Sequence, residues 1–223
     1  MVYYRGERNP HRMRTMLKIL WNGLRNAYDG AFVVVLSNLA FVLLCIPLIT
    51  IPLAVAGLYY TNYQLAAGES IEWKTFFEGI KQYWWAGIRW TIINGIVLFS
   101  LSFYVIFLYD RSEFWASALM GLDLAIMAIW VLMQFMTFPM MLIQEKPGFL
   151  RSLRNVGVFL LRWPGFSFTF LLPILVLVIA SLLFAPLWIF FSAGLVAYLG
   201  SYAVHYRIDS ERHPELYADP RHE

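Results

Sequence analysis

Residues 36–66 constrain the fold of this chain more than any other stretch. They include no charged side chain, and Pro47 and Pro52 lie near their middle. One membrane-spanning helix takes about 20 apolar residues, so the stretch is too long for a single span. It predicts two spans that meet in a tight turn bounded by the two prolines. The chain then returns to the side of the membrane on which it began, and all later spans inherit that parity.

The composition restricts the chain to one class of protein. Hydrophobic residues make up 60% of the sequence and charged residues 14%, whereas ordinary soluble domains carry about 25% charged residues. The apolar runs are continuous and lack the alternation of a membrane β-barrel. We therefore expect an all-α fold, a polytopic membrane helical bundle. The single cysteine, Cys45, excludes an internal disulfide bond.

Apolar runs predict six transmembrane helices, and they divide the chain into three parts. Residues 1–30 are expected to form a basic, amphipathic cytoplasmic segment, residues 31–206 the six-span membrane domain, and residues 207–223 a poorly ordered cytoplasmic tail. The proline at position 139 is expected to kink the fourth span or to mark its end. The expected spans are residues 31–48, 51–66, 88–109, 114–143, 165–184 and 186–206.

Two further stretches, residues 70–85 and residues 149–162, are amphipathic. Each carries an apolar stripe on one helical face and cations on the opposite face, which is typical of helices in the plane of the membrane interface. We expect two cytoplasmic interfacial helices. Their cations would contact either anionic lipid of the inner leaflet or an acidic partner surface, two alternatives of equal weight. The candidate residues for docking or lipid contact are Lys74, Lys81, Arg151 and Arg154.

Basic residues indicate the orientation of the spans. In the six-span arrangement, 16 of the 17 lysines and arginines lie on the side of the two termini, and Arg111 alone lies on the other side. If residues 36–66 formed one span, the division would be seven against ten. Because basic loops stay in the cytoplasm, the six-span arrangement is favoured, with both termini cytoplasmic. This distribution also explains the net charge of +3 without a nucleic-acid partner.

The sequence contains none of the common motifs of catalysis or metal binding. It has no glycine-rich phosphate loop, no Cys or His pair at metal-ligand spacing and no nucleophile elbow. We therefore expect no enzymatic activity, no cofactor and no metal ion.

Four polar residues within the expected spans are the candidates for an intramembrane site. Asp123 is the one acid deep inside a span. It is interpreted either as a substrate or coupling carboxylate or as a packing acid that is hydrogen-bonded, kept protonated by burial, or nearer the outer surface, and the second interpretation is favoured. Asn38, Asn94 and Gln134 are expected to form interhelical hydrogen bonds.

The order of several short motifs resembles a known family. The motifs are Asn38, the turn at residues 47–52, Ala-Gly-Leu-Tyr at 56–59, Trp-Lys-Thr-Phe-Phe at 73–77, and Phe138-Pro139 followed by Arg-Ser-Leu at 151–153. This order resembles the YesL family of small bacterial integral membrane proteins, a domain of unknown function. The resemblance implies a location in the bacterial inner (plasma) membrane and an association with carbohydrate ABC importers. It implies no catalytic or binding residues.

These features predict a non-enzymatic accessory or scaffold subunit in contact with other membrane subunits, which the resemblance implies are importer permeases. The alternative is a small transporter that acts through a bundle-interior site near Asp123. A water-filled cavity around that carboxylate would favour the transporter, and a dry, packed centre would favour the scaffold. An enzyme acting on lipids would need a nucleophile–base pair, and no such pair is evident in the sequence.

Overall fold

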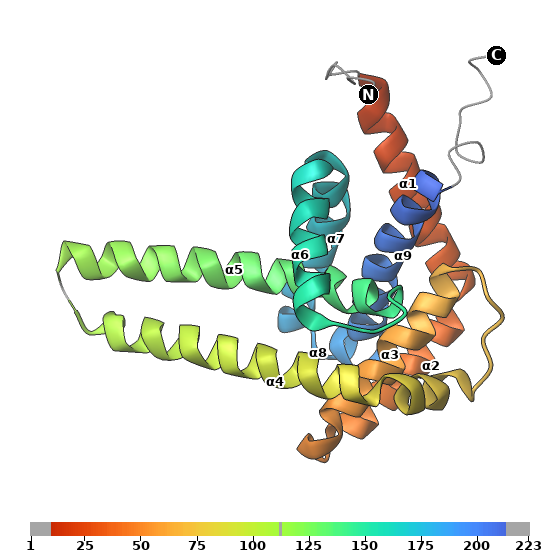
Figure 1. The fold of residues 1–223 in the computed structure, drawn as a ribbon, viewed down its shortest axis with the longest axis horizontal. Helices are drawn as coiled ribbons and strands as arrows, with labels where there is room; N and C mark the ends of the chain where they lie inside the picture. Colours follow the sequence, from red (N-terminus) through yellow and green to blue (C-terminus); the bar gives the residue numbers. More distant parts are fainter. Residues whose placement is uncertain (1–9, 112, 213–223) are drawn as a thin grey trace.

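A computed structural model describes residues 10–111 and 113–212, and within these ranges the chain is all-helical (Figure 1). The predicted fold class is therefore confirmed at the level of an all-α protein. A 3₁₀ turn at Leu48–Thr50 and a π-helical turn at Trp188–Ser192 interrupt the α-helices. The helices are α1 (Pro10–Asp29), α2 (Ala31–Cys45), α3 (Ile51–Ala66), α4 (Thr75–Tyr109), α5 (Phe114–Leu142), α6 (Phe149–Arg162), α7 (Pro164–Leu183), α8 (Ala185–Leu187) and α9 (Ala193–Arg212).

In the described part of the chain, four helices are long and apolar enough to cross a membrane. These are α4, α5, α7 and the continuous run from α8 to α9, and a fifth results if α1 and α2, bent by 73° relative to each other, count as one broken span. A membrane-embedded protein is thus supported, whereas fewer than the six expected spans are long and apolar enough to cross a membrane. Helices α2 and α3, of 15 and 16 residues, rise about 22–24 Å, less than the roughly 30 Å of a hydrocarbon core.

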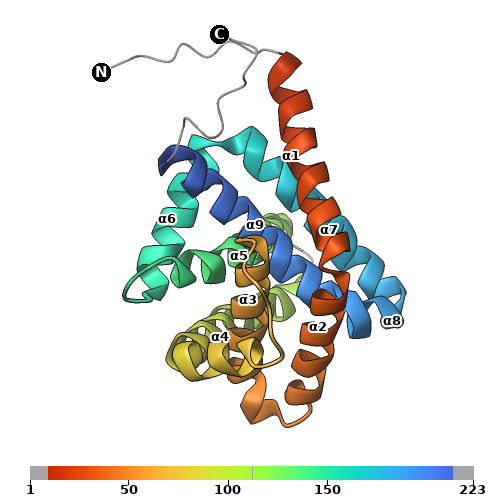
Figure 2. The ribbon, with the colours of Figure 1, turned by 90° about the vertical axis from the view of Figure 1, so that its right-hand side faces the viewer.

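The turn predicted between Pro47 and Pro52 is present. The chain reverses between the end of α2 and the start of α3, and Pro52 lies in the first turn of α3, where its missing N–H needs no partner. The hydroxyl of Thr50 donates to the carbonyl oxygens of Leu44 and Pro47 and so ties the turn to the end of α2. Helices α2 and α3 pack against each other as a short hairpin (Figure 2).

The expected separate interfacial helix at residues 70–85 is not found, and that prediction is wrong. Residues 75–85 are instead the first turns of α4, which continues without a break to Tyr109. The sequence pattern of α4 changes from amphipathic to apolar along the helix. The helix continues through this change, because α4 contains no proline. Two glycines of α4 allow this helix to pack closely against α3. A Cβ on Gly87 would lie 2.1 Å from the carbonyl oxygen of Pro52, and one on Gly79 would lie 2.6 Å from Cβ of Tyr60.

The second amphipathic stretch forms a helix of its own, and α6 has the bounds predicted for it. Trp163, with φ −131° and ψ 61°, ends α6, and Pro164 begins α7. The expected tail requires a correction, because its first six residues continue α9 to Arg212. The other residues of the tail, and residues 1–9, lie outside the described ranges.

Helix α9 lies at the centre of the molecule and contacts α1, α2, α3, α5 and α7. Helices α4 and α5 form a long antiparallel hairpin that projects to one side of the other helices (Figure 1). In Figure 2 the hairpin points away from the viewer, and α2, α3 and α9 run across its direction. The near half of α4 packs on α3, and the far half has only α5 beside it, so the molecule has a packed body and a projecting arm.

Candidate functional site

The four polar residues expected inside the membrane do not converge on one site. Asn38 lies on α2 and is fully buried. Its amide nitrogen donates to the carbonyl oxygens of Trp188 (3.1 Å) and Ile189 (2.5 Å), and its amide oxygen accepts the N–H of Gly194 at 2.8 Å. A π-helical turn departs from the regular hydrogen-bond pattern of the α-helix around it. Asn38 therefore fastens α2 to the π-helical turn before α9.

Two serines complete this attachment. The hydroxyls of Ser181 on α7 and Ser192 in the π-helical turn are hydrogen-bonded to each other, and Ser192 also donates to the carbonyl oxygen of Leu187 at 2.9 Å. Close approach requires glycine here, since a Cβ on Gly194 would lie 2.7 Å from the carbonyl oxygen of Val34. No pattern in the sequence predicted the π-helical turn. Asn38, Ser181 and Ser192 thus join α2 and α7 to this turn through hydrogen bonds to backbone groups and between the two serine hydroxyls.

Asn94 and Gln134 meet between α4 and α5. The amide nitrogen of Asn94 donates to the side-chain oxygen of Gln134 at 3.2 Å and to the carbonyl oxygen of Trp90 at 2.8 Å. The indole N–H of Trp130 donates to the amide oxygen of Asn94 at 2.9 Å. This network joins the two helices at the base of the hairpin, next to the packed body.

Asp123 lies farther out on the hairpin. It is about 16 Å along α5 from Gln134, at 1.5 Å per residue, and it is not part of the Asn94 network. The residue is 8% exposed, and its Oδ2 atom has no hydrogen-bond partner within the described part of the chain. A buried carboxylate oxygen without a partner is costly. Among the four candidates, Gln134 also has a buried atom without a partner, its Nε2, but its side-chain oxygen accepts from Asn94.

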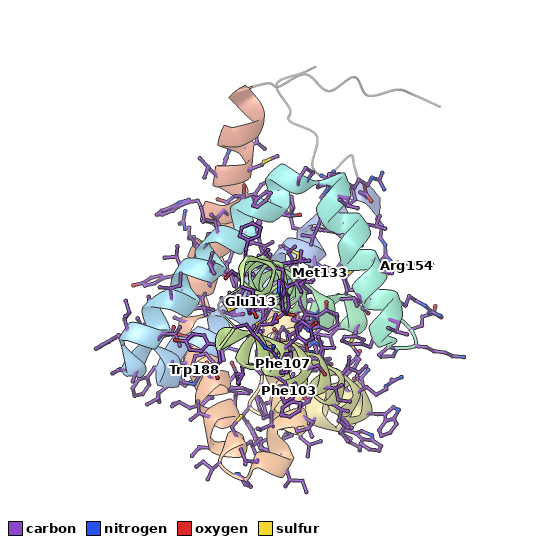
Figure 3. The ribbon with its side chains drawn as sticks, turned by 90° about the vertical axis from the view of Figure 1, so that its left-hand side faces the viewer. Phe103, Phe107, Glu113, Met133, Arg154 and Trp188 are labelled. Carbon is purple, nitrogen blue, oxygen red and sulfur yellow. The ribbon has the colours of Figure 1, made fainter. Side chains whose placement is uncertain are left out.

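Large apolar side chains occupy much of the rest of the hairpin surface and are uncovered. Figure 3 looks along the hairpin from its tip, where Phe103 and Phe107 stand on α4 and Glu113 marks the start of α5. Covering such side chains contributes roughly 1.5–3 kcal/mol each when burial is complete. Uncovered apolar surface of this extent is typical of contact with lipid or with another protein. The large exposed side chains beyond the Asn94 network include Ile96, Phe99, Phe103, Phe107, Tyr109, Phe114, Leu122, Ile126 and Ile129.

The four candidate docking cations are all exposed but do not form one patch. Lys74 precedes α4 and stands 5.6 Å from the ring centroid of Trp73, and Lys81 follows on α4. Arg151 and Arg154 lie on α6. Arg154 alone among the four borders a cleft between α6 and α9, of about 360 Å³.

The cleft contains residues that the sequence did not single out. Arg162 comes from the end of α6, Arg207 and Glu211 come from the end of α9, and Trp163 lies between α6 and α7. Positions 154, 158 and 162 recur at helical spacing, so one wall could have been found from the sequence. The other wall lies in the segment that was expected to be a poorly ordered tail.

No described group of three or more His, Cys, Asp or Glu side chains is arranged to hold a metal ion. Comparisons with models of protein families, with curated proteins and with solved structures find no match for this chain.

Proposed function

We propose that this protein is a non-enzymatic integral membrane accessory or scaffold subunit. The observation that carries the proposal is the α4–α5 hairpin, which projects from the packed body with its apolar surface uncovered (Figures 1 and 3). An arm of this kind has room for contact with the helices of another membrane subunit along its length. The polar residues Asn38, Asn94 and Gln134 act within the chain, as hydrogen bonds between helices.

The outer face of α5 is the part of the hairpin best suited to a partner helix. Its small residues follow helical spacing and lie opposite the buried residues Ala116 and Asp123, which face α4. Small side chains let two membrane helices approach closely, and packing then drives their association. The small exposed residues on this face are Ala118, Gly121, Ala125 and Ala128.

Substitution of Gly121 by leucine tests this face. A Cβ on Gly121 meets no other atom within 4 Å, and the same is true of Gly95 on α4. Both leucine variants therefore leave the chain itself unstrained. We expect Gly121→Leu to lose the chains that co-purify with the wild-type protein in mild detergent, and Gly95→Leu, the matched control, to retain them. Retention in both variants would remove the α5 face from the proposal.

The proposed partners are the permeases of a carbohydrate ABC importer, and this part rests on the resemblance to the YesL family. Mass-spectrometric identification of the co-purified chains tests it directly. Recovery of the protein with no importer subunit would leave a scaffold of another assembly.

We also propose the six-span topology, with both termini in the cytoplasm of a bacterial inner membrane. It is supported by the distribution of 16 basic residues against one, with the α2–α3 hairpin as a pair of short spans. The loop after α3 separates this topology from the alternative. Gly68 has φ +79°, a conformation that favours glycine, so exposed Ser70 is the better reporter position. In a Cys45→Ala background, Ser70→Cys should react with an impermeant thiol reagent only after the membrane is opened.

The second candidate function is a small transporter, and the buried, unpartnered carboxylate oxygen of Asp123 favours it. The substitution Asp123→Asn separates the two candidates, because it replaces the carboxyl group by an amide of nearly the same shape. A scaffold should keep its partner chains and its cellular phenotype. Loss of the phenotype with normal expression and normal co-purification would support the transporter instead.

A further inference from the structure

The cleft between α6 and α9 is built from two helical faces that meet at Trp163. Residues of α6 line one wall at intervals of about one turn, and the last turns of α9 line the other wall. Met140 of α5 and Phe159 of α6 are both buried and form its apolar floor. The side chains that border the cleft are Met140, Arg154, Asn155, Val158, Phe159, Arg162, Trp163, Arg207, Ile208 and Glu211.

The rim of the cleft is strongly basic. Three arginines and one glutamate border it, which gives a formal net charge of +2. The guanidinium carbons of Arg162 and Arg207 lie 4.6 Å and 4.4 Å from the ring centroid of Trp163. Stacking on an indole restricts where a guanidinium can lie. Two guanidinium groups are thereby held beside one ring at the mouth of the cleft.

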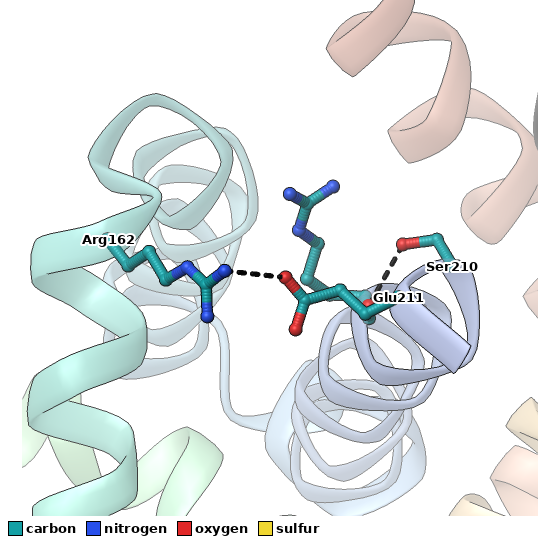
Figure 4. Close-up of polar contacts among 4 residues, drawn as sticks. Arg162, Ser210 and Glu211 are labelled. Atoms are coloured by element: carbon teal, nitrogen blue, oxygen red, sulfur yellow. Dashed lines mark hydrogen bonds and ion pairs between the residues drawn. The ribbon is translucent and has the colours of Figure 1, made fainter. Parts of the chain in front are cut away.

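The carboxylate of Glu211 is an anionic group that already pairs with an arginine of the cleft. Its Oε1 atom lies 3.4 Å from a terminal nitrogen of Arg162, and both side chains are well exposed (Figure 4). An exposed pair of this kind contributes little to folding, and a competing anion can replace it. At the same turn of α9, the hydroxyl of Ser210 donates to the carbonyl oxygen of Arg207 at 2.9 Å.

We propose that this cleft binds a phosphate group, with Arg154, Arg162 and Arg207 as its cationic ligands. Guanidinium groups donate paired hydrogen bonds that match the oxygens of a phosphate. The apolar floor and the exposed side chains of Val158 and Leu161 on α6 suit a ligand that also has an apolar part. The phosphate of an anionic phospholipid headgroup meets both requirements, and a free phosphate meets only the first. The proposal is independent of the scaffold function.

Two arginines on the same helix provide a matched test. Arg154 borders the cleft, whereas Arg151, one turn earlier on α6 and equally exposed, does not. Native mass spectrometry of the purified full chain in detergent would count adducts of phosphatidylglycerol, with phosphatidylcholine as the uncharged reference. We expect Arg154→Gln and Arg162→Gln each to weaken phosphatidylglycerol binding by about fivefold to tenfold, and Arg151→Gln to leave it unchanged.

Glu211→Gln gives a test in the opposite direction, which misfolding cannot imitate. It removes the competing carboxylate from Arg162 and raises the net charge of the rim, so phosphatidylglycerol binding should increase. If Arg151→Gln and Arg154→Gln weaken binding equally, the attraction is a diffuse surface effect and the cleft is not a site. No change in any of the variants would also overturn the proposal.

Inorganic phosphate distinguishes the two sources of the group. A higher unfolding temperature in sodium phosphate than in sodium chloride of equal ionic strength, abolished by Arg162→Gln, would show that the free anion suffices. Phosphatidylglycerol binding that phosphate does not displace would identify the lipid headgroup. Both results support a phosphate site, and absence of both effects in the wild-type protein would refute it.

Discussion

Helix α9 and the α4–α5 hairpin are both apolar enough to cross a membrane, yet they have opposite surroundings. In the most apolar 18-residue stretch of each helix, 61% of the residues are buried in the span that contains α9, and 11% are buried in α4 and in α5. The stretches in α4 and α5 nevertheless have the higher mean hydropathy. Hydropathy thus identifies a membrane helix but does not tell which helix the rest of the chain covers.

The space around individual glycines shows the difference between α9 and the hairpin more directly. A Cβ on Gly200 of α9 would lie 2.3 Å from the carbonyl oxygen of Phe135, whereas Cβ atoms on Gly95 and Gly121 of the hairpin would meet nothing within 4 Å. In α9 the small residues let neighbouring backbones come close. In the hairpin the same residue type faces open space, which is where another chain or lipid can approach.

The largest expected effect is an opposite response to one substitution in the two regions. Gly200→Ala should destabilise the protein by about 3 kcal/mol, since the added methyl group collides with backbone. Gly121→Ala should have no cost and can add up to about 1 kcal/mol through higher helix propensity. Unfolding of the detergent-solubilised protein with denaturant measures both. Equal stability of the two variants would contradict the assignment of body and arm.

Asparagines allow a second test of the comparison. Asn38→Ala leaves two carbonyl oxygens of the π-helical turn and the N–H of Gly194 in α9 without this partner, at a cost of about 2 kcal/mol. Asn94→Ala breaks hydrogen bonds between α4 and α5 and should cost about 0.6 kcal/mol, an average value for membrane helices. Unfolding of each variant under the same conditions gives the difference. A larger loss for Asn94→Ala would place the dominant polar contact in the hairpin.

The smallest effect should come from truncation of one aromatic ring in each region. Phe138 is fully buried in the body and stacks on Tyr59 with 4.9 Å between ring centroids, so Phe138→Leu should cost about 1 kcal/mol. Phe103 stands exposed on the hairpin, and Phe103→Leu should change stability by less than about 0.5 kcal/mol. A measurable loss for Phe103→Leu in the isolated chain would show that the arm folds back on the body.

The sequence by itself determined the helical membrane class, the proline-bounded turn and the bounds of α6. Each of these depends on local properties: the length of an apolar run, the position of a proline, or the periodicity of one helix. The fifth expected span, 165–184, also lies close to α7 (Pro164–Leu183), because Pro164 begins that helix and its apolar run is uninterrupted.

Only the tertiary structure decided the continuity of α4, the π-helical turn and the cleft between α6 and α9. Backbone hydrogen bonds of a helix do not depend on which face is polar. Helix α4 therefore continues unbroken where its sequence changes from amphipathic to apolar near Trp85. Asn38 and Trp188 are joined across 150 positions of the chain, and Arg154 and Arg207 border one cleft from helices distant in sequence. No local pattern contains such pairings, because they arise only when the helices pack.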